Sequence, residues 1–339
     1  TLAFVFLCGT NLSAQNILEH TRSQVVSPDG KYNFAVYQKE CVGGAKQLCY
    51  TLSYNGKTVI EESELGVLIE NQLFESALAI PNDTHKIWGE NLTLTGKMVN
   101  DTDTIWKPVY GERSLIRDHY NELTFRFSKS DENAGEHEGG YDKRCYYMMD
   151  FVVRAYNEGI AFRYHFPEAT NGLFLHIVGE QTQFTLPEGT MAYYERWAQG
   201  PYSLLPLKNW TDECERPLTM KLQNGLTVAL TEAGMVDYAR MKFRLSDKKA
   251  NTLQASLYSS VDVITPYNTP WRVIMAVEKA TELIANNDII LNLNPGNKIK
   301  DTSWIKPGKV IRVSKLSQED AKRCVDFASE RGLQYIHID

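Results

Sequence analysis

One carboxylate lies in an unusually aromatic segment of the chain. The segment YYERWAQGPY, residues 193–202, places Glu195 among four aromatic side chains. A carboxylate in such a setting can bind a hard cation such as Ca²⁺ through its oxygens. It can also accept hydrogen bonds at the rim of a sheet, which is the more ordinary role of an acid beside tyrosines. On the residues alone, both interpretations of Glu195 stay open.

Three further segments carry chemically active side chains. HEGGY, residues 137–141, offers His and Glu beside a Gly-Gly pair, which is typical of a surface loop but also suits a metal or substrate loop. LTEAGMVDYARM brings Glu232 close to Asp237, and NTPWRVIM places Trp271 beside Arg272. An ordinary salt bridge at a strand end explains either of the last two segments.

Several function classes find no support in the sequence. GxGxxG, the P-loop, HExxH and GxSxG are all missing, so nucleotide binding, zincin chemistry and the usual serine-hydrolase elbow are not indicated. The chain also lacks CxxC spacing, which argues against a structural zinc site. A net charge of -6 without a long basic run argues against a nucleic-acid surface.

Length and composition indicate a folded protein of more than one domain. The 339 residues suffice for about two domains, and the 43% hydrophobic content can fill a sizeable core. Tyrosine is frequent at 18, beside 6 Trp and 13 Phe. Such aromatic content fits strands and core packing first, and sugar-stacking surfaces second.

The first residues predict export. TLAFVFLCGTNLSAQ joins an apolar run to a small-residue exit at Ser13 and Ala14, which is typical of the back half of a secretory signal peptide. We therefore assign residues 1–15 to a signal peptide remnant and expect a secreted protein of the bacterial periplasm. Nothing else in the sequence approaches the ~20 apolar residues of a membrane span.

Export permits disulfides. Cys41 and Cys49 flank VGGAKQL, a Gly-Gly turn between two strand-like runs, so we expect a bond between them across a hairpin.

Residues 16–285 read as one large β-sandwich domain. Alternating apolar and polar runs recur throughout, and Asp29-Gly30 and Asn55-Gly56 are strong hairpin turns. More than a dozen strands cannot lie in one open sheet without pairing face to face, so the fold class is mainly β. A single weak helix is expected within this domain, at residues 277–287.

The C-terminal part changes character. Residues 286–308 are polar, carry two Pro-Gly pairs and read as a linker, with Trp304 as its packing anchor. Residues 309–339 read as strand, helix and strand, with Ser317 as N-cap and Gly332 after the last turn. This βαβ unit suits the start of a (β/α)₈ barrel, and Asp339 ends its second strand, where active sites of such barrels gather.

Five segments together resemble a known family. In this order, YNEGIAFRYHF, LTEAGMVDY, TPWRVIM, LNLNP and DTSWIKPGKV resemble the N-terminal half of glycoside hydrolase family 97, over residues 15–339. The resemblance implies a large β-sandwich packed on a catalytic (β/α)₈ barrel, in exo-acting α-glycosidases assisted by Ca²⁺. It implies that Glu195 is the carboxylate that the sandwich contributes to the calcium site.

The same resemblance implies that this chain stops before the catalytic carboxylates. Glycosidases need two carboxyl groups, about 5 Å apart when retaining and about 6.5–9.5 Å apart when inverting. We therefore name no catalytic residue and no substrate-binding residue, and we expect the 339-residue chain alone to be inactive.

The residues after KPGK favour one branch of the family. Lys309 is followed by VIRVSKLS, whereas the inverting α-glucosidases usually carry a Trp-rich run there. The chain thus looks more like the retaining α-galactosidases, acting on terminal α-linked galactose of oligosaccharides. An inverting α-glucosidase and a non-catalytic carbohydrate-binding sandwich are the alternatives.

Overall fold

The computed structural model describes residues 17–70, 87–129, 147–167 and 174–339. The predicted signal remnant at 1–15 and the HEGGY segment at 137–141 lie outside these ranges. The chain divides into two compact units, residues 1–104 with 117–295 and residues 105–116 with 296–339. Among the described helices, none is long and apolar enough to cross a membrane.

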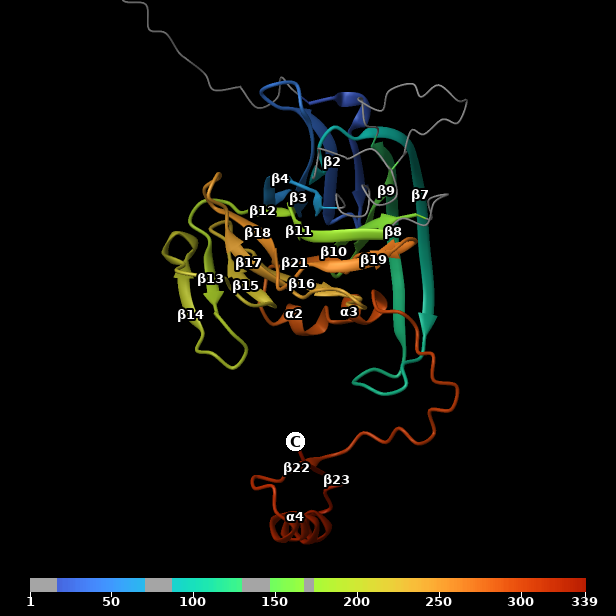
Figure 1. Cartoon of the computed structure of the whole chain (residues 1–339), viewed down its shortest axis with the longest axis vertical. Helices are drawn as coiled ribbons and strands as arrows, with labels where there is room; N and C mark the ends of the chain where they lie inside the picture. Colours follow the sequence, from blue (N-terminus) through green and yellow to red (C-terminus); the bar gives the residue numbers. More distant parts are fainter. Residues whose placement is uncertain (1–16, 71–86, 130–146, 168–173) are drawn as a thin grey trace, which may run out of the picture. The chain divides into compact units, whose positions relative to one another are not determined.

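Antiparallel strands dominate, as the alternating sequence pattern predicts (Figure 1). A seven-stranded sheet contains, in spatial order, β1 (Ser23–Val26), β2 (Tyr32–Glu40), β3 (Lys46–Tyr54), β4 (Lys57–Glu64), β12 (Gln183–Thr185), β18 (Thr252–Leu257) and β17 (Met241–Leu245). A four-stranded sheet contains β19 (Val261–Ile264), β11 (Phe174–Glu180), β5 (Val67–Ile69) and β6 (Ile87–Trp88).

The largest sheet has ten strands. Its order is β14 (Ser203–Pro206), β13 (Met191–Tyr194), β15 (Leu218–Lys221), β16 (Thr227–Ala233), β21 (Trp271–Val277), β10 (Ile160–Phe166), β9 (Tyr147–Tyr156), β8 (Ile116–Lys129) and β7 (Thr93–Trp106), while β20 (Tyr267–Asn268) pairs with β10. Two single-turn 3₁₀ helices, η1 (Glu19–Thr21) and η2 (Leu207–Asn209), complete the irregular connections.

The predicted hairpin turns set the register of the first four strands. Asp29-Gly30 connects β1 to β2, and Asn55-Gly56 connects β3 to β4. Gly30 adopts φ of 77°, while Asn55 and Gly56 adopt 49° and 73°. Glycine tolerates this left-handed region, and Asn visits it more readily than most residues, so the turns form where the sequence places them.

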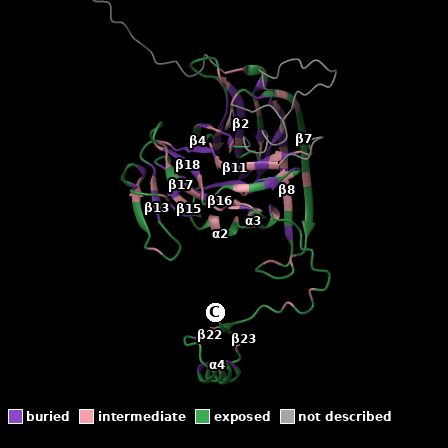
Figure 2. Cartoon of the chain, in the orientation of Figure 1, coloured by how far each residue is buried: buried purple, intermediate pink, exposed green. Residues whose placement is uncertain are grey.

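The core lies between the seven-stranded and ten-stranded sheets. Phe34 on β2 and Tyr50 on β3 contact Phe162 on β10, with ring centroids 5.9 and 5.5 Å apart. All three side chains are fully buried. Figure 2 shows the buried residues concentrated on these strands. Two sheets that bury aromatic faces against each other form a β-sandwich, so the predicted fold class is confirmed.

The helix predicted at residues 277–287 is confirmed only in its second half. Val277 ends β21, whose seven residues are all buried, and helical structure begins only at α2 (Glu282–Ala285), followed by α3 (Asp288–Asn292). Ile289 and Leu293 pack with Trp271 in a second apolar cluster on the ten-stranded sheet. The boundary between the two units follows at residue 295, inside the predicted linker.

The disulfide expected between Cys41 and Cys49 does not form. Both thiols are free, with Cys41 exposed and Cys49 buried. Cys49 on β3 is opposite Tyr37 on β2, whereas Cys41 lies in the turn beyond the last pair of that ladder, Glu40 and Lys46. The two cysteines do flank a hairpin, but its register offsets them along the strands.

The second unit contains the predicted βαβ unit. β22 (Val310–Arg312) pairs in parallel with β23 (Tyr335–His337), and α4 (Gln318–Arg331) connects them. The Ser317 hydroxyl accepts a hydrogen bond from the Asp320 amide at 3.1 Å, and Gly332 ends the helix at φ of 66°. Both predicted caps are confirmed, while the barrel that this unit was expected to begin stays a prediction.

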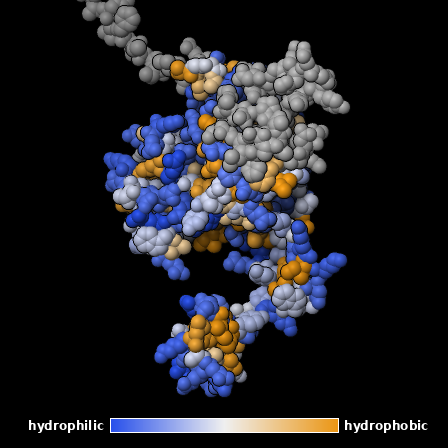
Figure 3. Space-filling model, viewed as in Figure 1, coloured by the Kyte–Doolittle hydropathy of each residue, from blue (hydrophilic) through white to orange (hydrophobic). Residues whose placement is uncertain are grey.

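Apolar side chains remain exposed in this second unit. Figure 3 shows a hydrophobic area on its visible face, and the exposed apolar residues include Val310, Val325 and Ile338. Trp304 is 66% exposed, so the prediction that it packs as an anchor is wrong for the described part of the chain.

Candidate functional site

The hairpin of β13 and β14 positions Glu195. Tyr194 at the end of β13 pairs with Ser203 at the start of β14, so residues 195–202 form the connecting loop. Tyr194 is buried against Trp210, with ring centroids 4.9 Å apart. Glu195 is therefore the first residue of a loop whose start is fixed at the edge of the ten-stranded sheet, where β13 and β14 lie (Figure 1).

Glu195 is held by its backbone and by its side chain. Its amide donates to the Cys214 sulfur at 3.4 Å, and its carbonyl accepts from the Glu215 amide at 2.8 Å. Its Oε1 accepts from the Gly200 amide at 3.1 Å. The residue is only 9% exposed. Tyr202 makes a hydrogen bond to the Glu195 carboxylate, which raises the pKa of Tyr202, and partial burial raises it further.

The side chains around Glu195 can be compared with what a calcium site needs. Ca²⁺ takes six to eight oxygen ligands. Within the described ranges, no group of three or more His, Cys, Asp or Glu side chains is placed to hold a metal ion. The neighbouring Cys214 offers sulfur, whereas Ca²⁺ binds oxygen ligands, and burial raises the pKa of its thiol to about 11. Glu195 fits as one carboxylate ligand, and no two further His, Cys, Asp or Glu side chains of the described residues are placed to complete a site with it.

A buried charge network lies on the strands near this loop. It consists of Glu180, Glu215, Arg216, Glu232 and Arg272. Arg272 on β21 is opposite Glu232 on β16 and donates to its Oε2 at 2.8 Å. The Arg272 guanidinium also donates twice to Glu180, from Nε at 3.1 Å and from Nη2. A salt bridge at a strand end is the ordinary interpretation of each of these two segments, and the structure has one that joins them, between Arg272 and Glu232.

The charges of the network favour the ionised state of Arg272. Arg272 is 1% exposed, and burial alone would lower its pKa. The carboxylates of Glu180 and Glu232 outweigh that effect and raise the pKa instead. Burial, together with the Glu180 charge, also raises the pKa of Tyr238, whose hydroxyl donates to Glu180 at 3.1 Å.

The network reaches Glu195 through Glu215. Arg216 donates to Glu232 at 2.5 Å and to Glu215 at 2.9 Å. Arg240 and Lys242 lie 3.1 and 3.3 Å from the other Glu215 oxygen. Since the Glu215 amide also holds the Glu195 carbonyl, the network fixes the base of the loop.

The carboxylates of this network do not qualify as a glycosidase pair. Glu180, Glu215 and Glu232 are at most 5% exposed in their side chains, and each is paired with at least one cation. A catalytic acid or nucleophile must reach substrate, whereas these groups are enclosed and neutralised. The structure therefore adds no catalytic residue to the sequence prediction, which named none.

Sequence reasoning missed three members of the network, Glu180, Glu215 and Arg216. Glu180 ends the strand FLHIVGE, and Glu215 follows the buried Cys214. The sequence feature that could have identified these two residues is a glutamate at or near the end of an apolar segment. That signal does not identify the arginine that will pair with it.

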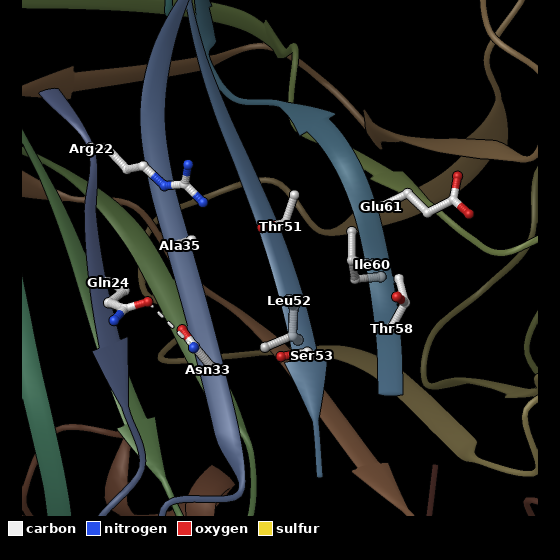
Figure 4. Close-up of a pocket in the computed structure, with 10 residues that line it drawn as sticks. All are labelled: Arg22, Gln24, Asn33, Ala35, Thr51, Leu52, Ser53, Thr58, Ile60 and Glu61. Atoms are coloured by element: carbon white, nitrogen blue, oxygen red, sulfur yellow. Dashed lines mark hydrogen bonds between the residues drawn. The ribbon is translucent and has the colours of Figure 1, made fainter. Parts of the chain in front are cut away.

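A polar hollow of about 260 Å³ lies on the seven-stranded sheet (Figure 4). Small side chains, Ala35, Thr51 and Ser53, lie between Arg22 on one side and Glu61 on the other. Glu61 is the single carboxylate in its lining, so the hollow cannot supply the two carboxyl groups of glycoside hydrolysis.

The chain resembles curated α-galactosidases. It is 25% identical to the retaining alpha-galactosidase of Bacteroides thetaiotaomicron, over all of this chain and 52% of that protein. It is 24% identical to a probable retaining alpha-galactosidase of Streptomyces bingchenggensis, over 86% of this chain and 42% of that protein. The chain thus spans about half the length of the curated relatives it matches.

Solved structures of similar fold come from the same family. A Glycoside Hydrolase Family 97 enzyme from Pseudoalteromonas sp. strain K8, in complex with panose, matches with a TM-score of 0.74 and 27% identity, over 94% of this chain and 47% of that one. The same enzyme in complex with acarbose matches equally well.

The family assignment rests on the domain that contains the site. The pattern of the glycosyl-hydrolase 97 N-terminal domain matches residues 25–295, which include both Glu195 and the charge network. The chain therefore belongs to glycoside hydrolase family 97 and carries its N-terminal β-sandwich domain.

Proposed function

We propose that this chain is the N-terminal part of a retaining α-galactosidase that releases terminal α-linked galactose from oligosaccharides. The observation that carries the proposal is the match along the whole chain to a protein named retaining alpha-galactosidase. The segment VIRVSKLS after Lys309 supports the same branch, because it lacks the Trp-rich run of the α-glucosidases.

The proposal places the chemistry in a barrel that begins with β22, α4 and β23. Retaining hydrolysis needs a nucleophilic carboxylate and a second carboxyl group that acts first as acid and then as base. Parallel pairing of β22 with β23 is the geometry of a barrel unit, and their exposed apolar side chains suit burial by further strands and helices.

Calcium is part of the proposal. Glu195 would contribute one oxygen ligand, and the remaining ligands would come from the barrel. When bound, the ion would polarise or position groups in the sugar pocket. The hydrogen bond from Gly200 and the two backbone bonds of Glu195 hold the side chain in one place, as a metal ligand requires.

An α-glucosidase of the same family is the second candidate. The solved enzyme from Pseudoalteromonas was captured with panose, a trisaccharide of glucose, at 27% identity to this chain. That identity is close to the 25% shared with the curated α-galactosidase, so substrate preference has to be measured.

The test compares initial rates on aryl α-galactoside and aryl α-glucoside. The protein is expressed from the complete reading frame, with the signal peptide predicted from residues 1–15, and the 339-residue chain serves as control. We expect a strong galactoside preference for the complete protein and no turnover by the control. A glucoside preference would transfer the protein to the second candidate, and activity of the 339-residue chain would contradict the location of the carboxylates.

The calcium proposal has its own readout. Titration of the metal-free complete protein with Ca²⁺ in a calorimeter should show a site that Glu195→Gln weakens at least tenfold. Glu188→Gln, which changes an exposed glutamate before β13, is the matched control. Unchanged calcium affinity in the Glu195 variant would remove this residue from the site.

A further inference from the structure

The loop that carries Glu195 also displays two aromatic side chains to solvent. Trp197 is 53% exposed and Tyr202 is 61% exposed, whereas Glu195 beside them is 9% exposed. Large aromatic rings are normally placed where their area is covered. Two half-exposed rings beside an enclosed carboxylate therefore need an explanation.

Gly200 holds the Trp197 ring in place. A Cβ atom at position 200 would lie 2.8 Å from the Trp197 carbonyl oxygen and 3.2 Å from its ring atom Cε2, so the indole packs directly on the glycine. The Gly200 amide donates to the same carbonyl at 2.9 Å and to Glu195 Oε1 at 3.1 Å. The ring is thus positioned by a closed turn and is not a free side chain on a loop.

Groups that hydrogen-bond surround the ring. The Arg196 guanidinium lies 5.7 Å from the Trp197 ring centroid and pairs with Asp212. Both charged side chains are about half exposed. The surface thus combines a half-exposed apolar ring with a guanidinium over it and the carboxylate that pairs with that guanidinium.

This combination matches the chemistry of a pyranose. A sugar ring has an apolar face of C–H groups and a rim of hydroxyls. The face gains dispersion contacts on an indole, and the hydroxyls can bond to charged groups around it. A neutral ligand also suits a surface whose guanidinium is already balanced by a carboxylate.

We propose that Trp197 is the stacking platform of a sugar subsite, formed by the loop of residues 195–202, that binds one ring of an oligosaccharide. The inference rests on the proposed glycosidase function for its substrate class. It assigns to the sandwich domain a direct part in holding the oligosaccharide, through Trp197 and the neighbouring pair of Arg196 and Asp212.

The test measures sugar binding by the 339-residue chain, without catalysis. Raffinose, which ends in α-linked galactose, and panose are titrated in a calorimeter against wild type and Trp197→Ala. We expect binding of at least one sugar in the millimolar range and a loss of about tenfold in the variant, equal to about 1.4 kcal/mol. Trp197→Phe keeps a smaller ring and should recover part of the affinity.

Two further variants separate stacking from general damage. Gly200→Ala removes none of the side chains of the subsite, but its Cβ would lie 3.2 Å from the Trp197 ring and should displace the indole, so it should weaken binding as Trp197→Ala does. Tyr258→Ala removes another exposed aromatic ring and should leave binding unchanged. Tyr258 is 71% exposed, and, like Trp197, its ring has a guanidinium over it, that of Arg240 at 4.8 Å from the ring centroid. Circular dichroism confirms that each variant is folded.

Three results would overturn the inference. These are no binding of either sugar by the folded wild-type chain, equal affinity of wild type and Trp197→Ala, or an altered association state of Trp197→Ala with unchanged sugar affinity. The last result would make the ring a protein contact. Failure of the proposed function is distinct, because it appears as missing turnover by the complete protein while Trp197-dependent binding persists.

Discussion

Replacing Arg272 by methionine should destabilise the sandwich far more than an arginine replacement on the surface. Arg272 bonds both Glu180 and Glu232, and the three side chains are 1%, 0% and 5% exposed. Methionine fills similar space but provides no charge. The variant would therefore bury carboxylates whose counter-ion has gone.

The expected loss of stability depends on which partners Glu232 and Glu180 retain in the Arg272→Met variant. Glu232 retains Arg216 at 2.5 Å and the Met241 amide. Glu180 retains only neutral donors in the described part of the chain, the hydroxyls of Tyr238 and Thr182. One buried charge is thus left uncompensated, which costs about 3–5 kcal/mol.

Urea denaturation of the chain measures this loss, and Arg117→Met is its matched control. Arg117 pairs with Asp103 at 2.7 Å, but the two side chains are 56% and 51% exposed, so the control should lower stability far less than Arg272→Met does. Adding Glu180→Gln to Arg272→Met should restore part of the stability, because the buried group is then neutral. A loss below about 1 kcal/mol, or no recovery in the double variant, would refute the reasoning.

Three other predictions concern thiols, a close backbone contact and a buried cation. Under native conditions at pH 8, a thiol reagent should label the exposed Cys41, whereas the buried Cys214, whose pKa is raised to about 11, should react only after unfolding, as mass spectrometry would show. Gly89→Ala should cost about 1–3 kcal/mol in urea denaturation, because its Cβ would lie 2.0 Å from a backbone carbonyl oxygen, whereas at Gly96 the nearest atom is 3.8 Å away and alanine should be tolerated. Burial lowers the pKa of Arg163 to about 10, so its protonation opposes folding below that pH; Arg163→Met should be at least as stable as wild type at pH 7, and a clear loss would show that the ring contact with Trp271 dominates.

Local signals in the sequence predicted the strands and turns well. Asn55-Gly56 specifies a hairpin because both residues tolerate positive φ, and the structure places them in that conformation. Ser317 and Gly332 similarly specify both ends of α4. Each of these features depends on a few neighbouring residues, which is why the sequence alone was enough.

Features that depend on distant partners were predicted poorly. The run WRVIMAV continues as a strand through Val277 because both of its faces are covered, one by the sandwich core and one by the cluster that contains Ile289. Nothing within the segment reveals the second covering. Cys41 and Cys49 have a plausible spacing for a bond, but the ladder register, which places Cys49 opposite Tyr37, decides their separation.

The candidate site also combines a residue that the local sequence identifies with partners that only the fold brings to it. Glu195 could be singled out from the sequence because it stands among aromatics, but its support could not, since Glu215 and Arg216 reach it through the fold. The Glu215 amide holds the Glu195 carbonyl, while the Glu215 side chain is tied to Arg216 and so to the charge network. A change in the network should therefore move the loop of residues 195–202. Variants that weaken the network without unfolding the domain should reduce calcium affinity and Trp197-dependent sugar binding together, because one backbone contact positions both.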